Sequence, residues 1–318
     1  MTSVIGWQAG RVSNNLFRPF MIRKLITVLA ALGIAASALA KEAAPCPNVL
    51  SVGEPAVRVE AGNTRLLCYR AYAVLYSDNT RTALWSAERL TAAAVEAARK
   101  LPRDSEFYEE DRLPASARAR LTDYLRSGFD RGHLSPSADF SDKSAQAESF
   151  SLANIVPQNS VSNRRTWSHI ETSTRRLARE HGTIHVVTGP AFTKDAAALN
   201  GRVRVPTYLW KAVYVPGVGA AAYVVRNDAT PAYSAISIDE LAHFTGVDPF
   251  PALTRAQRSQ PIDLPAPAPH PGEKPSRRVK FSWLVSGESL VEKSPGGSIH
   301  RLVGDAGALA TLLLAYAR

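Results

Sequence analysis

The stretch Phe129–Glu171 sets tighter limits on the fold and chemistry of this 318-residue chain than any other part of it. It begins with Asp130–His133, the tetrapeptide Asp-Arg-Gly-His, at a strand end or tight turn. The imidazole of His133 can take a proton from water, and the guanidinium of Arg131 offers a planar fork to a phosphate oxygen. Gly132 lets the backbone bend so that both side chains reach one point. The simpler interpretation is a turn in which the aspartate and the arginine pair with each other.

A helix with side chains suited to metal binding follows. From Ser162 onwards apolar residues recur at spacings of three and four, and Gly182 is a good helix stop, so a helix is predicted between them. Asn163, Trp167 and Glu171 then lie on one side of it, at positions i, i+4 and i+8. An amide oxygen and a nearby carboxylate suit a hard, hydrated cation, Mg²⁺ rather than zinc. Taken singly, the asparagine would be a helix cap and the glutamate a solvated surface residue.

In combination these features resemble the DNA/RNA non-specific endonucleases, sugar-non-specific enzymes with a ββα-metal (His-Me finger) active site. The matching positions are Asp130–His133, Asn154–Gln158, Asn163 and Glu171. The resemblance covers roughly Leu67 to Leu253. It implies an α+β fold, with a central antiparallel sheet flanked by helices, and an enzyme that hydrolyses the phosphodiester bonds of DNA and RNA through contacts with their phosphates.

The resemblance also implies roles for individual residues. His133 is expected to be the general base. Asn163 is expected to be the one direct protein ligand of a Mg²⁺ ion, for which Mn²⁺ is an expected substitute. Glu171 is expected to hold a water of the metal, and Asn154 and Arg131 to shape the phosphate site.

The region before the signature is predicted to contain two strands and a short helix. Leu66–Tyr76 has the β-branched and aromatic content of a core strand, and Arg81–Leu90 is predicted as a second strand across a turn. Pro114–Leu125 has apolar residues at helical spacing. Arg81 stands in a Thr-Arg-x-x-x-Trp context that resembles the family's second phosphate-binding arginine. The simpler interpretation is a turn arginine in solvent.

Residues 1–40 are predicted to be an N-terminal extension plus a signal peptide. Met21 is followed by a basic Ile-Arg-Lys, an apolar run to Ala35 and a small-x-small site that ends at Ala40. The pattern predicts Met21 as the true start, Lys41 as the mature N-terminus, and a periplasmic or secreted protein. The alternative is a transmembrane anchor, which needs about 20 apolar residues, more than this run holds.

Export changes the interpretation of the two cysteines, Cys46 and Cys68. In an oxidising compartment two cysteines are expected to form one disulfide, here between the N-terminal arm and the first strand. The alternative is a pair of buried free thiols.

The remaining boundaries follow from composition. A nuclease domain is predicted over residues 41–253. Six prolines fall within the fifteen residues 261–275, which predicts a stiff Pro-rich linker over 254–278. Residues 279–318 are predicted to be a C-terminal appendage, whose final apolar run is too short to cross a membrane.

Net charge supports a polyanionic partner only weakly. The whole chain carries +10, and residues 1–40 hold four basic and no acidic side chains, so the mature chain carries about +6. Two other functions are compatible with this sequence. One is a phosphodiesterase with a substrate other than nucleic acid, and the other is a non-catalytic exported DNA-binding protein.

Overall fold

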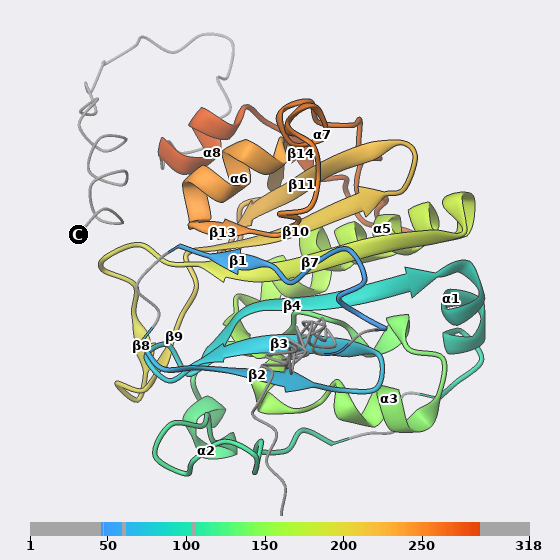
Figure 1. Cartoon of the computed structure of the whole chain (residues 1–318). Coiled ribbons are helices and arrows are strands. Elements are labelled where there is room, and N and C mark those ends of the chain that lie inside the picture. Colours follow the sequence, from blue (N-terminus) through green and yellow to red (C-terminus); the bar gives the residue numbers. More distant parts are fainter. Residues whose placement is uncertain (1–45, 47, 59–61, 103–105, 287–318) are drawn as a thin grey trace, which may run out of the picture. The chain divides into compact units, whose positions relative to one another are not determined.

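An eight-stranded sheet organises the part of the chain that the computed structural model describes, residues 46, 48–58, 62–102 and 106–286. The strand order is β14-β12-β11-β10-β7-β4-β3-β2, antiparallel except for the parallel β12–β14 pair (Figure 1). The strands are β2 (Thr64–Cys68), β3 (Tyr72–Ser77), β4 (Thr82–Thr91), β7 (Thr183–Ala191), β10 (Tyr208–Val215), β11 (Gly219–Arg226), β12 (Ala232–Ile236) and β14 (Arg277–Arg278). The predicted α+β fold with a central antiparallel sheet is confirmed.

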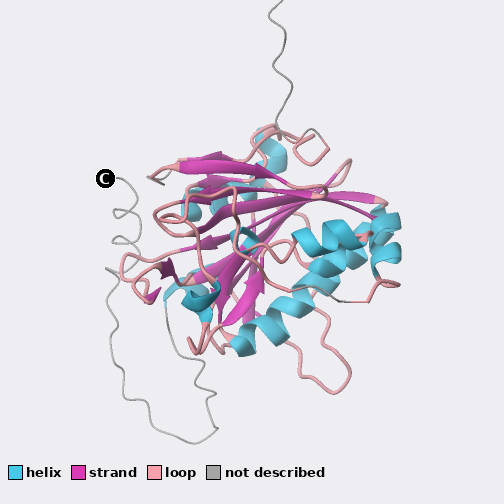
Figure 2. Cartoon of the chain, turned by 90° about the horizontal axis from the view of Figure 1, so that it is seen from below, coloured by secondary structure: helices cyan, strands magenta, loops and turns pink. Residues whose placement is uncertain are grey.

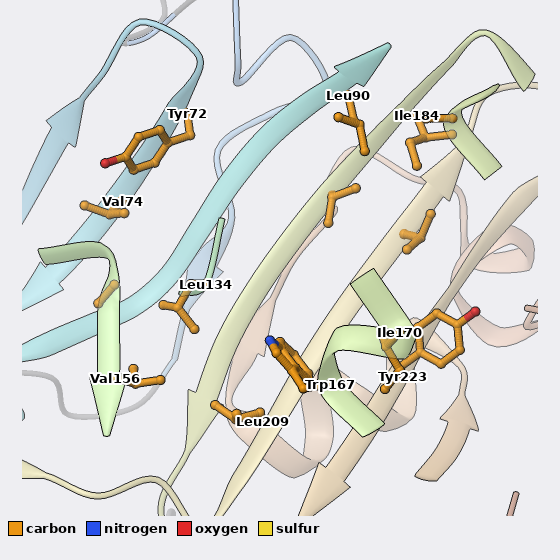
Figure 3. Packing of buried hydrophobic residues seen from close by; sticks show 14 of the residues in the cluster. Tyr72, Val74, Leu90, Leu134, Val156, Trp167, Ile170, Ile184, Leu209 and Tyr223 are labelled. Carbon is orange, nitrogen blue, oxygen red and sulfur yellow. The ribbon is translucent and has the colours of Figure 1, made fainter. Parts of the chain in front are cut away.

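Helices cover both faces of this sheet, because its strands are apolar on both sides (Figure 2). On β10, Leu209 and Val213 pack with Trp167 into the cluster under α5 (Ser168–His181), which also includes α1 (Ala92–Ala98). Trp210, on the opposite face, joins the cluster of α6 (Ile238–Thr245) and α8 (Phe281–Ser286). Figure 3 shows Trp167 on the α5 side, beside Leu209.

The remaining elements are short. Outside residues 130–133 and 155–167, they are two strand pairs, β1 (Ala56–Val57) with β13 (Val247–Asp248) and β8 (Ala198–Leu199) with β9 (Val203–Arg204), and the helices α2 (Leu121–Tyr124), α3 (Lys143–Glu148), α7 (Arg255–Ser259), η1 (Ser137–Asp139) and η2 (Leu152–Asn154). None of the helices in the described ranges is long and apolar enough to cross a membrane.

Two sequence-based element predictions are wrong in extent. Leu66–Tyr76 is not one strand but two, β2 and β3, because the chain turns where the Tyr69 amide donates to the Tyr72 carbonyl. The helix predicted over Pro114–Leu125 is limited to α2. The Tyr76 hydroxyl donates to the Ala117 carbonyl and accepts from the Ala119 amide, so tertiary hydrogen bonds replace those of a longer helix.

The segment predicted as a Pro-rich linker, residues 254–278, contains α7 and β14 and packs along the domain. The Tyr223 hydroxyl donates to the Pro265 carbonyl, and the Ser173 hydroxyl on α5 donates to the Ala266 carbonyl. Leu264 is buried in the cluster under α5. We call residues 261–275 the strap. Most of the predicted appendage, and all of the predicted signal peptide, lie outside the described residues.

The predicted disulfide joins Cys46 to Cys68, with a Cα–Cα distance of 5.5 Å. It attaches the N-terminal arm, which carries buried Val49 and Leu50, to the end of β2. The bridge spans a sequence separation of 22 residues, so loss of chain entropy in the unfolded state stabilises the fold by about 3 kcal/mol.

Replacing both cysteines by serine should therefore lower the free energy of unfolding by about 3 kcal/mol. Urea denaturation of oxidised and reduced wild type measures this, and the double variant, which should not respond to reductant, is the control. Equal stability of the oxidised and reduced wild type would contradict the assigned role.

Candidate active site

Two short strands and a helix form the unit that carries the predicted site. β5 (Asp130–His133) pairs antiparallel with β6 (Ile155–Gln158), with His133 opposite Ile155. The chain then enters α4 (Ser160–Ser162), the π-helical turn η3 (Asn163–Trp167) and α5. Only glycine fits at position 132, since a Cβ there would lie 2.1 Å from Oε1 of Gln158. The signature glycine is thus explained by the close approach of β6.

Asp130 joins the first strand of this unit to the start of its helix. Its Oδ2 accepts hydrogen bonds from Nδ2 of Asn163 at 3.0 Å and Nε of Arg164 at 2.9 Å, and its Oδ1 accepts from Nη2 of Arg164 at 2.9 Å. Burial alone would raise the pKa of Asp130, but these hydrogen bonds outweigh burial and hold the pKa below its usual value. The alternative interpretation, a turn in which Asp130 pairs with Arg131, is wrong.

The helix does not follow the regular spacing predicted for it. Asn163–Trp167 is π-helical, so the turn that contains Asn163 is wider than an α-helical turn, and Asn163 is shifted around the helix axis. Trp167 is completely buried, whereas Asn163 and Glu171 are half-buried. π-helical turns are rare and recur at functional sites.

His133 lies between two aromatic rings, and Arg131 reaches the same place. The imidazole is 8% exposed, with its centroid 5.4 Å from that of Phe107 and 5.0 Å from that of Phe150, which it meets edge-on. The exposed Arg131 lies on the same side of β5, since it is two residues away, and its guanidinium carbon is 4.6 Å from the Phe107 ring centroid. Phe107 therefore contacts both the imidazole of His133 and the guanidinium of Arg131.

Asn154 fixes the backbone that follows His133. Its Oδ1 accepts from the Ser135 amide and the Ser86 hydroxyl, and its Nδ2 donates to the carbonyls of Ser135 and Ser149, all at 2.8–3.1 Å. The side chain is fully buried, and these four bonds use its hydrogen-bonding capacity. In the structure Asn154 thus acts on the site through backbone position and has no capacity left for a phosphate.

A buried lysine supports the same backbone from the sheet. Lys211 on β10 is 1% exposed, and its Nζ donates to the Leu134 carbonyl at 3.2 Å and to the Thr188 hydroxyl at 2.6 Å. The ammonium also lies 5.5 Å from the Trp167 ring centroid. The lysine therefore connects the residue after His133 with the sheet and with the π-helical turn.

A group of buried charges lies near Glu171. Burial raises the pKa of the Glu88 carboxyl well above its usual value, and the charges of Asp139 and Glu171 raise it further, while Lys211 opposes them. Asp139 accepts a hydrogen bond from Arg175 at 2.9 Å. Burial thus favours the neutral form of the Glu88 carboxyl.

Arg81 is occupied away from this cluster. Its guanidinium donates to the carbonyl of Arg202 at 3.1 Å and to that of Ser116 at 3.3 Å, at the start of β4. These contacts are those of a side chain that connects two loops. Both Nη atoms of Arg81 are thus engaged by backbone carbonyls.

An open cavity of about 650 Å³ lies beside Arg131. Arg126 and Arg131 contribute two cations to its lining, and Phe107 and Tyr124 contribute two aromatic rings. Cations and aromatic faces together suit a phosphodiester chain with its bases. The cavity thus borders Phe107, the residue that contacts both Arg131 and His133.

Comparison with known proteins assigns this arrangement to a family. The model of the DNA/RNA non-specific endonucleases matches residues 56–256. The chain belongs to the DNA/RNA non-specific endonuclease family. This membership makes the described unit part of a nuclease domain.

Individual relatives agree with this assignment. Nuclease C1 of Cunninghamella echinulata var. echinulata is 33% identical over 183 residues, which cover 53% of this chain and 70% of that protein. Mitochondrial endonuclease G of Bos taurus is 30% identical over 248 residues, 73% of this chain and 80% of the relative. A nuclease of Syncephalastrum racemosum is 37% identical over 158 residues, so the match spans about half of each protein.

A solved structure agrees in fold. A chain in the crystal structure of the EndoG/EndoGI complex superposes with a TM-score of 0.59 at 23% identity, covering 66% of this chain and 93% of that one. At this identity the likeness concerns the fold alone.

The residues of the nuclease domain fit a hard metal ion at Asn163. Its Nδ2 is engaged by Asp130, and its Oδ1 accepts no hydrogen bond from the described residues. A carboxamide oxygen, with the half-buried carboxylate of Glu171 two turns further on, is the donor set of a cation that keeps most of its waters.

Sequence reasoning assigned no role to several side chains that build this site. Asp130, Glu88, Lys211 and Phe107 are the main examples. For two of them, Glu88 and Lys211, the sequence pattern of the strand did indicate a special role. Glu88 follows Ser86 and precedes Leu90 on the inward face of β4, and Lys211 lies between inward-facing Leu209 and Val213. A charged residue in an inward-facing series of a buried strand indicates a site.

The carboxylate of Glu110 is hydrogen-bonded to the loop that leads to Asn154. Glu110 is buried and accepts hydrogen bonds from Arg112, from the Tyr69 hydroxyl at 2.5 Å and from the Ser151 hydroxyl at 2.9 Å. Burial alone would raise the pKa of Glu110, but these hydrogen bonds outweigh burial and lower the pKa to about 2.

Because the pKa in the folded state lies below the usual value of 4.5, ionised Glu110 stabilises the fold above about pH 4.5, and this contribution is lost as the pH falls towards 2. Glu110→Gln should therefore lower the free energy of unfolding at pH 7 by up to about 3 kcal/mol, and the difference from wild type should shrink between pH 4.5 and pH 2.

Denaturant midpoints of the two proteins at several pH values test this, with exposed Glu106→Gln as the control. A difference that does not change with pH would contradict the account.

Proposed function

We propose that this protein is an exported, sugar-non-specific endonuclease that hydrolyses phosphodiester bonds of DNA and RNA with one Mg²⁺ ion and His133 as general base. The observation that carries the proposal is the ββα unit. In this unit Asp130, which lies three residues before His133, accepts a hydrogen bond from the side chain of Asn163. This unit carries His133, Arg131 and Asn163, the residues that we propose as base, phosphate-binding cation and oxygen ligand.

The residues of the chain divide the chemistry among them. The imidazole of His133 accepts a proton from the attacking water, and Phe107 and Phe150 keep the ring in place for this transfer. Arg131 donates to a phosphate oxygen and offsets its charge. Asp130 holds the amide of Asn163 so that its oxygen is available.

Asn163 would hold Mg²⁺ directly and Glu171 would hold it through a water. When bound, the ion would supply charge stabilisation at the phosphate and an acidic water for the leaving 3′ oxygen, with Mn²⁺ as an expected substitute. By family resemblance the products carry 5′ phosphates. No base-edge contact is needed, because every element of the site addresses the phosphate.

Export is part of the proposal. It is supported by the signal-peptide pattern of residues 21–40 and by the Cys46–Cys68 disulfide, which suits a periplasmic or extracellular compartment. Intact mass of the exported protein should correspond to a chain that starts at Lys41, and retention of residues 21–40 would count against export by this route.

Cleavage of plasmid DNA and RNA with Mg²⁺, compared with cleavage in EDTA, tests the reaction. His133→Ala should lower the cleavage rate by at least about 10²-fold, because the proton acceptor is lost, while binding of nucleic acid persists. His243→Ala, which removes an exposed histidine of α6, is the matched control and should cut normally. Normal cutting by His133→Ala would overturn the assignment of the base.

Asn163→Ala tests the metal ligand in the same assay. The variant should need more Mg²⁺ or lose activity, since it lacks the oxygen that binds the ion. An unchanged dependence on Mg²⁺ would exclude Asn163 as ligand. Binding without any cleavage by the wild type would favour a DNA-binding protein, and hydrolysis of other phosphodiesters alone would favour a different phosphodiesterase.

A further inference from the structure

Two histidines and a glutamate meet on the side of α5 that faces the strap. His169 comes from α5, and His270 and Glu273 come from the strap. One ligand atom from each residue lies within 4.8 Å of the others. The ring centroids of the two histidines are 5.0 Å apart, and Nε2 of His169 lies 2.5 Å from Oε2 of Glu273.

This cluster is separate from the site at Asn163. Trp167 and Glu171 belong to the side of the helix that faces the sheet and its buried charges. The opposite side, which contacts the strap and Ser276, carries Thr166, His169 and Ser173. The hydroxyls of Thr166 and Ser276 are hydrogen-bonded at 2.7 Å, and Ser173 forms hydrogen bonds with the strap backbone. The two sides alternate at helical spacing.

The sequence of the strap brings its two ligands together. His270-Pro-Gly-Glu273 forms a turn in which the Glu273 amide donates to the His270 carbonyl at 3.0 Å. Proline is favoured at the second position of a type II turn, and glycine at the third, where Gly272 has a φ of +86°. The turn therefore fixes a histidine and a glutamate side by side against the helix.

The third ligand is held rigidly. His169 is fully buried, and its Nδ1 has no hydrogen-bond partner among the described residues. All polar contacts of its imidazole are thus made by Nε2, inside the cluster. His270 is exposed and Glu273 is half-buried, so an ion could enter from solvent and keep a water as a fourth ligand.

We propose that His169, His270 and Glu273 bind a transition-metal ion of the zinc type, which clips the strap to α5. Two imidazoles and one carboxylate are a zinc donor set and a poor set for Mg²⁺. Tetrahedral bonds of about 2.0–2.1 Å place ligand atoms about 3.3 Å apart. The contact between His169 and Glu273 would open from 2.5 Å to about 3.3 Å, and the other ligand atoms, which lie within 4.8 Å of one another, would approach by up to about 1.5 Å.

The ion would stabilise the helix that carries Asn163 and Glu171 without taking part in hydrolysis. Binding to the folded state alone raises stability in proportion to the logarithm of the metal concentration over Kd. The clip thus links strap attachment to metal supply in the compartment where the protein works.

Equilibrium dialysis of tag-free, metal-stripped full chain against Zn²⁺ tests the proposal. Wild type, Asn163→Ala and the matched control His243→Ala should each bind one more equivalent than His270→Ala. Zn²⁺ should also raise the melting temperature of the first three proteins, and this rise should be absent in His270→Ala. Glu273→Gln, which keeps the size of the side chain and removes its charge, should bind Zn²⁺ at least tenfold more weakly.

Equal Zn²⁺ binding by His270→Ala and His243→Ala would overturn the proposal, and the cluster would then be a hydrogen-bonded contact only. The nuclease assay with Mg²⁺ distinguishes failure of the zinc proposal from failure of the proposed function. His270→Ala should still cut DNA whether or not it binds Zn²⁺.

Discussion

The carboxylate of Asp130 is the contact on which the active-site geometry depends. It accepts hydrogen bonds from Asn163 and Arg164 and so joins the strand that ends in His133 to the helix that begins at Asn163. Without this contact, His133 and the amide oxygen of Asn163 would belong to two elements joined through the β5–β6 pair and through apolar packing around Trp167. The pKa of Asp130 is depressed by the same hydrogen bonds, so the link is charged over the whole physiological range.

On the sheet face under α5, polar groups are buried in the core. Their burial costs desolvation energy unless they are hydrogen-bonded. Ser86, Thr188 and Lys211 interrupt the apolar face of the sheet under α5, and each makes hydrogen bonds. With Asn154 they hold Leu134 and Ser135, the two residues after His133. The sheet therefore does more than bury apolar surface, since its polar side chains also fix the backbone that follows His133. Burying these polar groups lowers the stability of the fold, and it fixes the position of the backbone at Leu134 and Ser135.

The sequence predicted the fold class, the ββα unit and the disulfide because each leaves a strong local pattern. It could not predict the turn that separates β2 from β3, since Tyr69-Arg-Ala contains no glycine or proline and has the composition of a strand. Nor could it predict the π-helical turn at Asn163, because apolar spacing does not distinguish a π from an α turn over five residues.

The hydrogen-bond partners of two predicted site residues could not be predicted for a related reason. Asn154 is saturated by four buried hydrogen bonds, and Arg81 is engaged by the carbonyls of Arg202 and Ser116. These partners are distant in sequence or belong to the backbone, so no motif records them. A motif specifies which side chains are present, whereas the fold decides which of their polar atoms remain available.

The account requires one ion to lie between the carboxamide of Asn163 and the imidazole of His133, separated from the imidazole by no more than a water. Anomalous scattering from crystals soaked in Mn²⁺ measures this most directly. The predicted result is a peak in contact with Oδ1 of Asn163, with His133 within reach of a water on the ion. A peak found only elsewhere on the molecule, with His133 and Asn163 facing apart, would contradict the account.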